Sequence, residues 1–434
     1  MKNITFTLVF SILFLSFTHA QTVRKTVSMG SGYAQNVWYN VETGVETKGT
    51  ATGWDLAISV RGFEAAIFTN PFDTLYRAAN SIANFATVSA ADTLPKTASR
   101  QLFNSDTTWS VGSINATLTG VFDYGWGSYN QVTNNVVGDS AYLIKLTNGT
   151  WKKIYIEKLA FDTSYFIKYA NLDGTNPQTV EVSKKAYLGK NFVYLNLTTN
   201  VLLDLEPKSA DWHLAFMRYH STAINPATGK TEPFVVAGVL SNTLLSITRG
   251  VPGYSGSFVA KVNGADTASN NFSNAQFKTS NGVIGGDWKY YDYANFRYVM
   301  SDTTKYFVKT QSGKVYKIIF KDFGGAANGN FVFTSQYIIG TSVKNPNDGV
   351  AALAINPNPA TDGQIQVVYD LGKNIQQADF QLFDLSGKNI FTKKLSRTEG
   401  VQIMTLPYLG LNSGIYVARI NVNGNPMIQK VVVQ

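Results

Sequence analysis

The sequence contains no cysteine in 434 residues. This absence excludes disulfide bonds, thiolate metal ligands, a cysteine nucleophile and a lipid-modified N-terminal cysteine. Charged residues are also scarce, at 15% of the chain, against 44% hydrophobic and 13% aromatic residues. A chain of this length with few charges and many aromatics is typical of a β-rich folded protein rather than a disordered one.

Clustered basic residues and long apolar runs are missing as well. The formal net charge is +9, but the lysines and arginines are scattered along the chain. Without a basic stripe, the sequence does not predict a nucleic-acid partner. No segment approaches the roughly 20 apolar residues that a membrane-spanning helix needs, so no transmembrane segment is predicted.

Signatures of catalysis are few. The glycine loops at Ser255-Gly256-Ser257 and Gly285-Gly286-Asp287 lack the strand-to-helix context of a nucleophile elbow or a phosphate loop. Pairs of loop carboxylates are not distinguished by their spacing from ordinary solvated acids. The sequence therefore predicts no enzyme, no catalytic residue and no structural metal site.

The N-terminus has the pattern of a secretory signal peptide. Lys2 gives a positive start, residues 6–17 are apolar, and the small residue Ala20 precedes Gln21. We expect residues 1–20 to be removed during export.

The C-terminal residues 354–434 have the pattern of a small antiparallel β-domain. The double X-Pro element Asn356-Pro357-Asn358-Pro359 separates this segment from what precedes it, so residues 346–353 are interpreted as a linker. Strand-length alternating runs are separated by turns such as Ser386-Gly387. The pattern predicts an immunoglobulin-like β-sandwich; the expected strands lie at 364–369, 379–384, 414–420 and 427–433.

Four motifs in this tail occur in a characteristic order: NPNPA from Asn356, FDLSGK from Phe383, LNSGIY from Leu411, and a lysine followed by valines from Lys430. Together they resemble the type A sorting domain of the Bacteroidetes type IX (Por) secretion system. The resemblance implies the type IX machinery as a partner, passage through the periplasm, and a secreted or outer-surface protein. Whether the mature protein is released or stays anchored is left open, and an unrelated immunoglobulin-like domain is the alternative.

An internal repeat with an offset of about 160 residues relates the two halves of the remaining chain. A hairpin pattern at 142–156 aligns without gaps with residues 306–320, and Trp126 precedes the first as Trp288 precedes the second. Residues 38–41 followed by 53–57 correspond to residues 193–197 followed by 211–215. We therefore expect two tandem β modules at 21–182 and 183–345, each with its own core and each able to fold alone.

The second module carries the sequence DWHLAFMR from Asp211 to Arg218, followed by the hairpin at 306–320. These motifs resemble the HmuY-like family of Bacteroidetes haem-binding proteins, and the first module has a degraded version in residues 54–61. The resemblance implies a mostly β fold that holds haem between loops through two axial His or Met ligands. The expected fold is thus all-β and mainly antiparallel, with two tandem HmuY-like modules and a C-terminal immunoglobulin-like β-sandwich.

Because haem iron accepts imidazole or thioether ligands, few residues qualify. In the second module these are His213, Met217, His220 and Met300, with Met217 or His220 preferred and Met300 as an outside candidate. The aligned element of the first module offers only Asp55 and Ser59, so haem is expected in the second module.

Each candidate has a structural alternative. His213 aligns with Asp55, which is no haem ligand, and Met217 can fill a core gap. His220 is expected at the start of a loop, where a solvated histidine is common. Along an extended strand His213 and His220 face opposite sides, so they cannot hold one iron together unless a bulge intervenes.

Two functions follow from these observations. The first is capture of haem or a similar planar ligand at the cell surface for nutrient acquisition. The second is surface adhesion or a structural role on an HmuY-like scaffold that no longer binds haem.

Deleting residues 354–434 should leave the protein in the periplasm with its preceding modules folded, because the tail is the predicted export signal and few contacts cross a proline-rich linker. Fractionation followed by immunoblotting measures the outcome. Normal surface display of the truncated protein would contradict the assignment of the tail.

Overall fold

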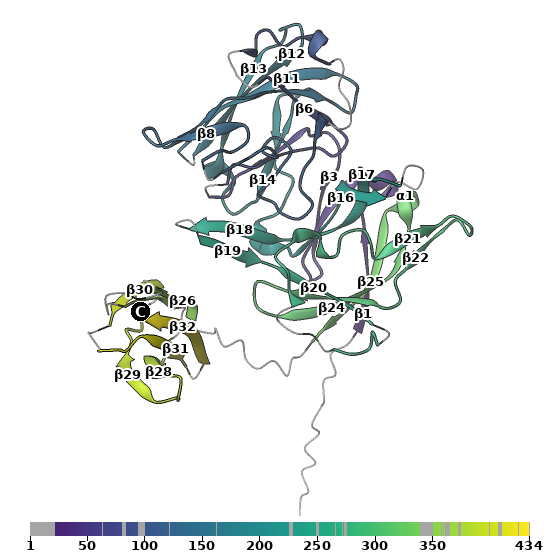
Figure 1. Cartoon of the computed structure of the whole chain (residues 1–434). Coiled ribbons are helices and arrows are strands. Elements are labelled where there is room, and N and C mark those ends of the chain that lie inside the picture. Colours follow the sequence, from purple (N-terminus) through teal and green to yellow (C-terminus); the bar gives the residue numbers. More distant parts are fainter. Residues whose placement is uncertain are drawn as a thin grey trace, which may run out of the picture. The chain divides into compact units, whose positions relative to one another are not determined.

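A computed structural model describes residues 22–433, apart from 63, 80–83, 94–99, 121, 162, 225–228, 249–250, 265, 271, 273–275, 339–349, 357, 359, 361–364, 372–374, 399, 407–409 and 424. The expected signal peptide lies outside the described residues. The chain divides into two compact units, with the boundary between Ile338 and Ile339. Antiparallel strands dominate both units, as Figure 1 shows, which confirms the all-β prediction.

The described residues of the first unit form 25 strands and several short helical turns. The strands are β1 (Thr22–Ser28), β2 (Gln35–Tyr39), β3 (Glu46–Thr50), β4 (Leu56–Ser59), β5 (Ile67–Thr69), β6 (Thr74–Ala79), β7 (Gln101–Leu102), β8 (Gly127–Asn130), β9 (Asn135–Gly138), β10 (Ala141–Lys145), β11 (Trp151–Ala160), β12 (Ser164–Asn171), β13 (Gln178–Ser183), β14 (Phe192–Asn196), β15 (Val201–Leu203), β16 (Leu214–Ile224), β17 (Thr231–Ser241), β18 (Thr243–Thr248), β19 (Val251–Gly256), β20 (Phe258–Asn263), β21 (Lys289–Asp292), β22 (Arg297–Met300), β23 (Thr304–Lys309), β24 (Val315–Phe323) and β25 (Asn330–Tyr337). The helical turns are η1 (Ser31–Tyr33), η3 (Ala90–Thr93), η5 (Lys184–Tyr187), η6 (Ser209–Asp211), η8 (Asn281–Val283) and α1 (Gly325–Asn328).

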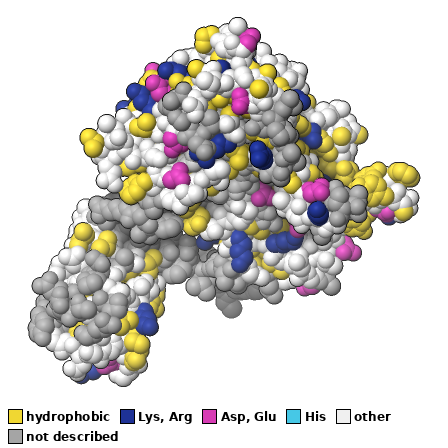
Figure 2. All heavy atoms as spheres, turned by 45° about the horizontal axis from the view of Figure 1, so that its top comes forward, with side chains coloured by type: hydrophobic (Ala, Val, Ile, Leu, Met, Phe, Trp, Pro, Cys, Tyr) yellow, Lys and Arg dark blue, Asp and Glu magenta, His cyan; other side chains and the backbone are white. Residues whose placement is uncertain are grey.

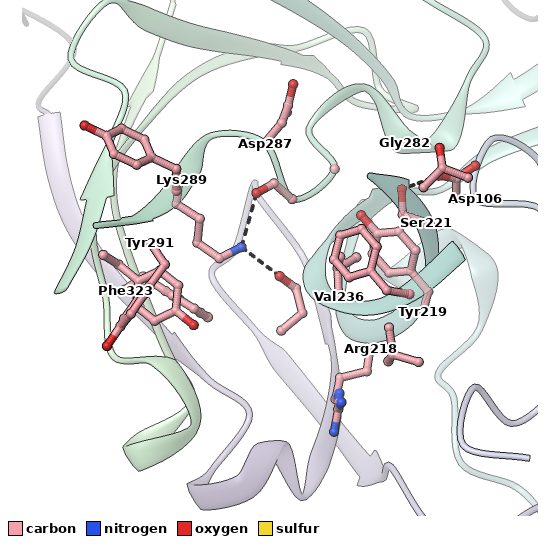
Figure 3. A pocket seen from close by; sticks show the side chains of 18 of the residues that line it. Asp106, Arg218, Tyr219, Ser221, Val236, Gly282, Asp287, Lys289, Tyr291 and Phe323 are labelled. Atoms are coloured by element: carbon pink, nitrogen blue, oxygen red, sulfur yellow. Dashed lines mark hydrogen bonds between the residues drawn. The ribbon is translucent and has the colours of Figure 1, made fainter. Parts of the chain in front are cut away.

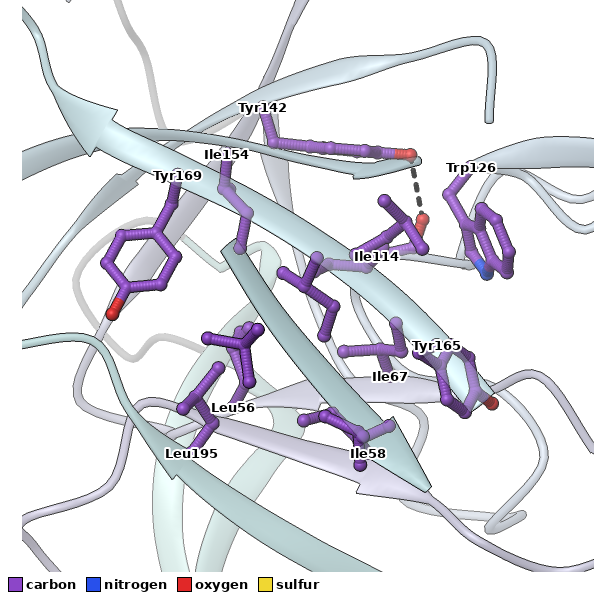
Figure 4. Packing of buried hydrophobic residues seen from close by; sticks show 14 of the residues in the cluster. Leu56, Ile58, Ile67, Ile114, Trp126, Tyr142, Ile154, Tyr165, Tyr169 and Leu195 are labelled. Atoms are coloured by element: carbon purple, nitrogen blue, oxygen red, sulfur yellow. Dashed lines mark hydrogen bonds between the residues drawn. The ribbon is translucent and has the colours of Figure 1, made fainter. Parts of the chain in front are cut away.

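Two hydrophobic cores define two lobes in this unit. Lobe 1, residues 51–206, packs the sheet β13-β12-β11-β10-β6-β7 against the four-stranded sheet β15-β14-β4-β5. Figure 4 shows its core, with Leu56, Ile58 and Leu195 of the smaller sheet facing Ile154 and Tyr169 of the larger one. Lobe 2, residues 22–50 and 207–338, packs β1-β25-β24-β23-β20 against β17-β16-β2-β3 in the same manner.

The repeat hairpins are present as predicted. Strands β10 and β11 pair with Tyr142 opposite Ile154, and β23 and β24 pair with Tyr306 opposite Ile318, so the two hairpins share one register. The aligned tryptophans Trp126 and Trp288 are both buried. The repeat is therefore a repeat of structure as well as of sequence.

The two repeats nevertheless exchange strands. Strand β14 from the second repeat pairs with β4 of the first, with Leu195 opposite Leu56. Strand β2 from the first repeat pairs with β16 of the second, with Tyr39 opposite Leu214. Strand β1 also joins the second repeat, because all seven of its residues pair with β25. Each four-stranded sheet thus takes two strands from each repeat.

This exchange corrects the expected division into modules at 21–182 and 183–345. The boundary follows the sequence repeat, but the folded lobes are residues 51–206 and the combination of 22–50 with 207–338. The physical reason is that alternation and turn motifs report local hairpins, whereas the choice of which repeat completes which sheet depends on long-range pairing.

Matching side-chain contacts hold both crossings. Asn40 Nδ2 donates to the carbonyl of Asp211 at 2.9 Å, and its repeat partner Asn196 Nδ2 donates to the carbonyl of Gly53 at 2.7 Å. Each asparagine also accepts backbone N–H groups of the turn that follows its strand. The two crossings are therefore fixed by the same hydrogen-bonding device.

A second pair of contacts follows the same pattern. His213 Nδ1 accepts the backbone N–H of Val41 at 3.1 Å, and Asp55 Oδ2 accepts that of Leu197 at 2.6 Å. His213 and Asp55 are aligned in the repeat, as are Val41 and Leu197. Both buried side chains are thus acceptors for the strand that arrives from the other repeat.

An aromatic cluster fills the junction between the lobes. It joins side chains of both lobes, with Trp109 and Trp212 in edge contact at 6.3 Å and Trp38 and Tyr194 at 6.4 Å. Truncating a buried tryptophan to alanine costs about 3–5 kcal/mol, so the shared cluster makes the lobes interdependent. The buried residues of the cluster are Trp38, Trp54, Ala57, Ala66, Phe68, Trp109, Phe192, Tyr194, Trp212, Ala215, Tyr219, Leu240 and Leu244.

The second unit is a two-sheet sandwich, as predicted for the tail. Its sheets have the orders β26-β27-β30 and β29-β28-β31-β32, and their inner faces bury Phe380, Leu382 and Ile420. The strands are β26 (Val350–Asn356), β27 (Gln366–Leu371), β28 (Ala378–Asp384), β29 (Asn389–Lys394), β30 (Gly400–Thr405), β31 (Gly414–Val422) and β32 (Asn425–Val433).

Fragments 21–182 and 183–338 should be unstable when expressed separately and should form a 1:1 complex when co-expressed. Fragment 21–182 contains β4 but lacks its partner β14, and it contains β2 but lacks β16. Fragment 183–338 contains β14 and β16 without these partners, so neither fragment can complete a four-stranded sheet alone. Size-exclusion chromatography and thermal melting measure both states. Two monomeric halves that each melt cooperatively alone would contradict the exchange.

Candidate functional site

Lobe 2 contains an open cleft of about 860 Å³. Its walls come from β16, β17, the segment 282–289, β22, the end of β24 and the turn η1. Figure 3 shows Lys289 in the middle of this cleft, with Phe323 and Tyr291 on one side and Tyr219 and Val236 on the other. The volume lies within the range of about 300–1,000 Å³ that is usual for small-molecule sites.

A close backbone approach positions the segment 282–289. Val239 and Gly285 exchange two backbone hydrogen bonds, each of 3.0 Å. A Cβ at Gly238 would lie 2.6 Å from the carbonyl oxygen of Gly285, and Gly285 has a φ of +61°. Glycine is therefore required at both positions for the segment to pack against β17.

Lys289 presents a desolvated cation to the cleft. Its Nζ donates to the carbonyls of Ala237 at 2.8 Å and Gly286 at 3.3 Å, and it lies 4.4 Å from the ring centre of Trp288. Burial lowers the pKa of Lys289 to about 8, against the opposing charge of Asp287. An ammonium has three N–H groups, so one remains to bind a ligand.

Arg218 presents a second cation. Its guanidinium lies 4.3 Å from the ring centre of Phe72 and 5.6 Å from that of Tyr33. Burial lowers its pKa, which Tyr33 partly opposes. In the part of the chain that the structure describes, Arg218 forms no ion pair.

The carboxylates at the edge of the cleft have other partners. Asp106 Oδ2 accepts a hydrogen bond from Ser221 at 2.8 Å, and Asp287 pairs with Lys261 at 2.7 Å. Neither Lys289 nor Arg218 has a carboxylate within ion-pair distance among the described residues. The cleft therefore combines two available cations with aromatic walls, which suits an anionic ligand with a flat apolar body.

Two tyrosines of the cleft are paired. Tyr33 and Tyr298 pack against the same ring, that of Phe323, with centroid distances of 6.2 and 4.8 Å. Burial, together with Tyr298, raises the pKa of Tyr33 to about 12, while the charge of Arg218 acts in the opposite direction. Tyr33 is therefore neutral in the free protein near pH 7.

His213 lies outside the cleft and has structural partners. It is 3% exposed, its Nδ1 accepts from Val41, and its Nε2 lies 3.9 Å from a carboxylate oxygen of Glu42. Burial lowers the pKa of His213, although Glu42 opposes the shift. Its two ring nitrogens thus face groups of the crossing strand.

His220 lies within β16 rather than at the start of a loop, because β16 continues to Ile224. Its ring packs edge-on against Phe103 at 4.9 Å, and its Nδ1 has no hydrogen-bond partner among the described residues. Burial lowers the pKa of His220 to about 4, so the imidazole is neutral at pH 7. His220 does not line the cleft.

The two methionines lie apart from each other. Met217 packs against the aromatic cluster at the junction of the lobes. Met300 ends β22 and lines a hollow of about 400 Å³, which shares Lys289 with the cleft. The structure does not bring His213, Met217, His220 and Met300 together around one point. Over the described residues, it also holds no cluster of three or more His, Cys, Asp or Glu side chains that suits a metal ion.

The sequence interpretation missed Tyr33, Arg218, Lys289 and Tyr298. One signal was available: Trp126-Gly127 aligns with Trp288-Lys289, so only the second repeat carries a cation beside its buried tryptophan. Tyr33 had no such signal, because it reaches lobe 2 only through the exchange of β1 and β2.

Two family matches agree with this architecture. Residues 189–337 match the HmuY protein family, and residues 354–434 match the secretion system C-terminal sorting domain. The chain thus combines an HmuY-like region with a type IX sorting tail, and it is exported to the cell surface or secreted. The first match contains Arg218, Lys289 and Tyr298 of the cleft.

Other comparisons add little. No curated protein sequence matches the chain. The crystal structure of dimeric latent PorU from Porphyromonas gingivalis is 14% identical, with 69% of this chain and 31% of that chain covered and a TM-score of 0.18. A biofilm-associated protein BSP domain is 9% identical, with 100% and 83% covered and a TM-score of 0.17. Within the described residues, no helix is long and apolar enough to cross a membrane.

Proposed function

We propose that this exported protein captures haem or a similar planar anionic ligand in the cleft of lobe 2. The observation that carries the proposal is the pair of cations, Lys289 and Arg218, which face an aromatic cleft without carboxylate partners. Haem is a flat apolar ring with two carboxylates along one edge. The cations match the carboxylates, and the aromatic walls match the ring.

The fit differs from the one expected from the sequence. The four His and Met candidates do not converge, and none of them lines the cleft. The proposal therefore assigns ligand capture to the charged and aromatic side chains of the cleft.

Surface adhesion is the second candidate, and one observation favours it. The hairpin β21–β22 carries Tyr290, Tyr293 and Phe296 with exposures of 63%, 77% and 81%. Figure 2 shows hydrophobic side chains gathered on a projection at the right of the view, on the side where Figure 1 places this hairpin. Exposed aromatics on a projecting hairpin are typical of interaction surfaces.

Haemin should bind the mature protein saturably, and Lys289→Gln and Arg218→Gln should each weaken binding by about 10- to 100-fold. This range follows from about 1.5–3 kcal/mol for a hydrogen bond to a charged group. Visible absorption titration measures the affinity. Lys309→Gln, on β23 outside the cleft, is the matched control and should bind as wild type does.

Two outcomes of this titration would contradict the proposal. Absence of saturable binding would favour the adhesion candidate. The second is equal affinity in wild type and both cleft variants, together with loss of binding in Met217→Ala or His220→Ala. This result would assign the haem ligands to the residues expected from the sequence.

Affinity for haemin should fall as the pH rises above about 8. Lys289 binds a carboxylate only as an ammonium, and burial places its pKa near this value in the free protein. The affinity should fall by up to tenfold per pH unit above the pKa of Lys289 in the free protein. The fall should end near the higher pKa that Lys289 has beside a bound anion. Titrations between pH 6.5 and 10 should show the fall in wild type and a flatter profile in Lys289→Gln; the same slope in both would assign the effect to another group.

A further inference from the structure

The cleft contains two tyrosines whose hydroxyl groups the capture of an anion does not need. Tyr33 and Tyr298 both pack on Phe323, and the guanidinium of Arg218 lies 5.6 Å from the ring centre of Tyr33. Tyr33, Tyr298 and Arg218 come from η1, β22 and β16, and all three line the cleft.

Packing fixes both rings. Tyr33 stacks on Phe323 with a centroid distance of 6.2 Å and an angle of 12° between the rings, and Tyr298 meets the same ring edge-on at 4.8 Å. The backbone of Tyr33 has a φ of +58°, in the left-handed region that residues other than glycine seldom adopt. The structure thus holds the Tyr33 hydroxyl at the cleft through an unusual backbone conformation.

The chemistry of a phenol in this setting is that of a metal ligand. A tyrosine oxygen binds haem iron as the phenolate, so its proton must leave when the bond forms. A neighbouring hydroxyl that donates a hydrogen bond and a guanidinium within a few ångströms both stabilise that negative charge.

We propose that Tyr33 coordinates the ferric iron of a bound porphyrin as a tyrosinate, with Tyr298 donating a hydrogen bond to the phenolate and Arg218 stabilising its charge. The proposal rests on the proposed function and specifies the iron ligand of that same cleft. The step balances without a redox partner: the phenol proton combines with the hydroxide that ferric porphyrin carries in water, and an iron–oxygen bond to Tyr33 replaces the iron–hydroxide bond.

Ligation by Tyr33 depends on the metal, because the phenolate oxygen bonds to iron and not to the porphyrin ring. A ferric porphyrin should therefore gain affinity from Tyr33, whereas a metal-free porphyrin with the same carboxylates should not.

The exchange of strands is a requirement of this site. Tyr33 lies between β1 and β2, which belong to the first repeat and pair with β25 and β16 of the second. The second repeat alone, residues 183–338, supplies Arg218 and Tyr298 but lacks Tyr33. The aligned position of the first lobe has Gly127 where the second has Lys289, so only lobe 2 assembles the full set.

The test compares haemin with metal-free protoporphyrin IX on the full mature chain. Wild type with haemin should show a high-spin ferric spectrum with tyrosinate bands in resonance Raman scattering. Tyr33→Phe should lose these bands and bind haemin at least about tenfold more weakly, while its affinity for protoporphyrin IX stays unchanged. Tyr298→Phe should keep the tyrosinate bands at shifted frequency. Tyr254→Phe, which changes an exposed tyrosine of β19 outside the cleft, should match wild type.

The outcomes separate the two proposals. If neither porphyrin binds wild type, the proposed function fails and this inference fails with it. If both bind and Tyr33→Phe leaves the spectrum and affinities unchanged, ligand capture stands and only the tyrosinate is overturned. A low-spin spectrum that is lost in His220→Ala or Met217→Ala also overturns it. Binding of protoporphyrin IX by Tyr33→Phe shows that the cleft is folded in that variant.

Discussion

Main-chain pairing between the two repeats is the constraint on which the rest of this protein depends. Strands β2 and β14 each pair with a strand of the other repeat, through the registers Tyr39–Leu214 and Leu195–Leu56. The same pairing buries the aromatic cluster at the junction and sets the buried acceptors Asp55 and His213. Without it, each lobe would expose sheet edges and apolar faces, which promote aggregation.

The proposed binding cleft depends on residues that only one of the two lobes provides. The aligned tryptophans are buried in both lobes, but Lys289 follows the tryptophan only in the second. Burying this cation without a carboxylate costs free energy, as its lowered pKa shows. A ligand that brings a carboxylate would recover that cost, so the free protein is electrostatically prepared for an anion.

Much of the architecture could be predicted from the sequence because strands and hairpins depend on local features, namely hydrophobic alternation and turn residues. The tail predicted at 354–434 coincides with the family match, and its strands and the repeat hairpins are present at the expected residues. The boundary at 182/183 was wrong because local alternation carries no information about which repeat completes a sheet. The alignment of His213 with Asp55 did indicate a structural role, and the matching hydrogen bonds explain why.

The site was harder to predict than the fold. Tyr33 and Tyr298 are 265 positions apart, and only strand exchange followed by packing on Phe323 brings them together. His220 was expected in a loop because the turn-forming residues near Pro226 mark the end of a strand, whereas β16 extends past His220 to Ile224. Side chains that meet through long-range pairing leave no periodic signal in one sequence.

The account is tested most directly by a crystal structure of the mature chain grown with haemin. We expect the porphyrin in the cleft of lobe 2, with its carboxylates toward Lys289 and Arg218 and its iron within bonding distance of the Tyr33 oxygen. A porphyrin held by His220, Met217 or Met300, or one found on the exposed hairpin β21–β22, would contradict it.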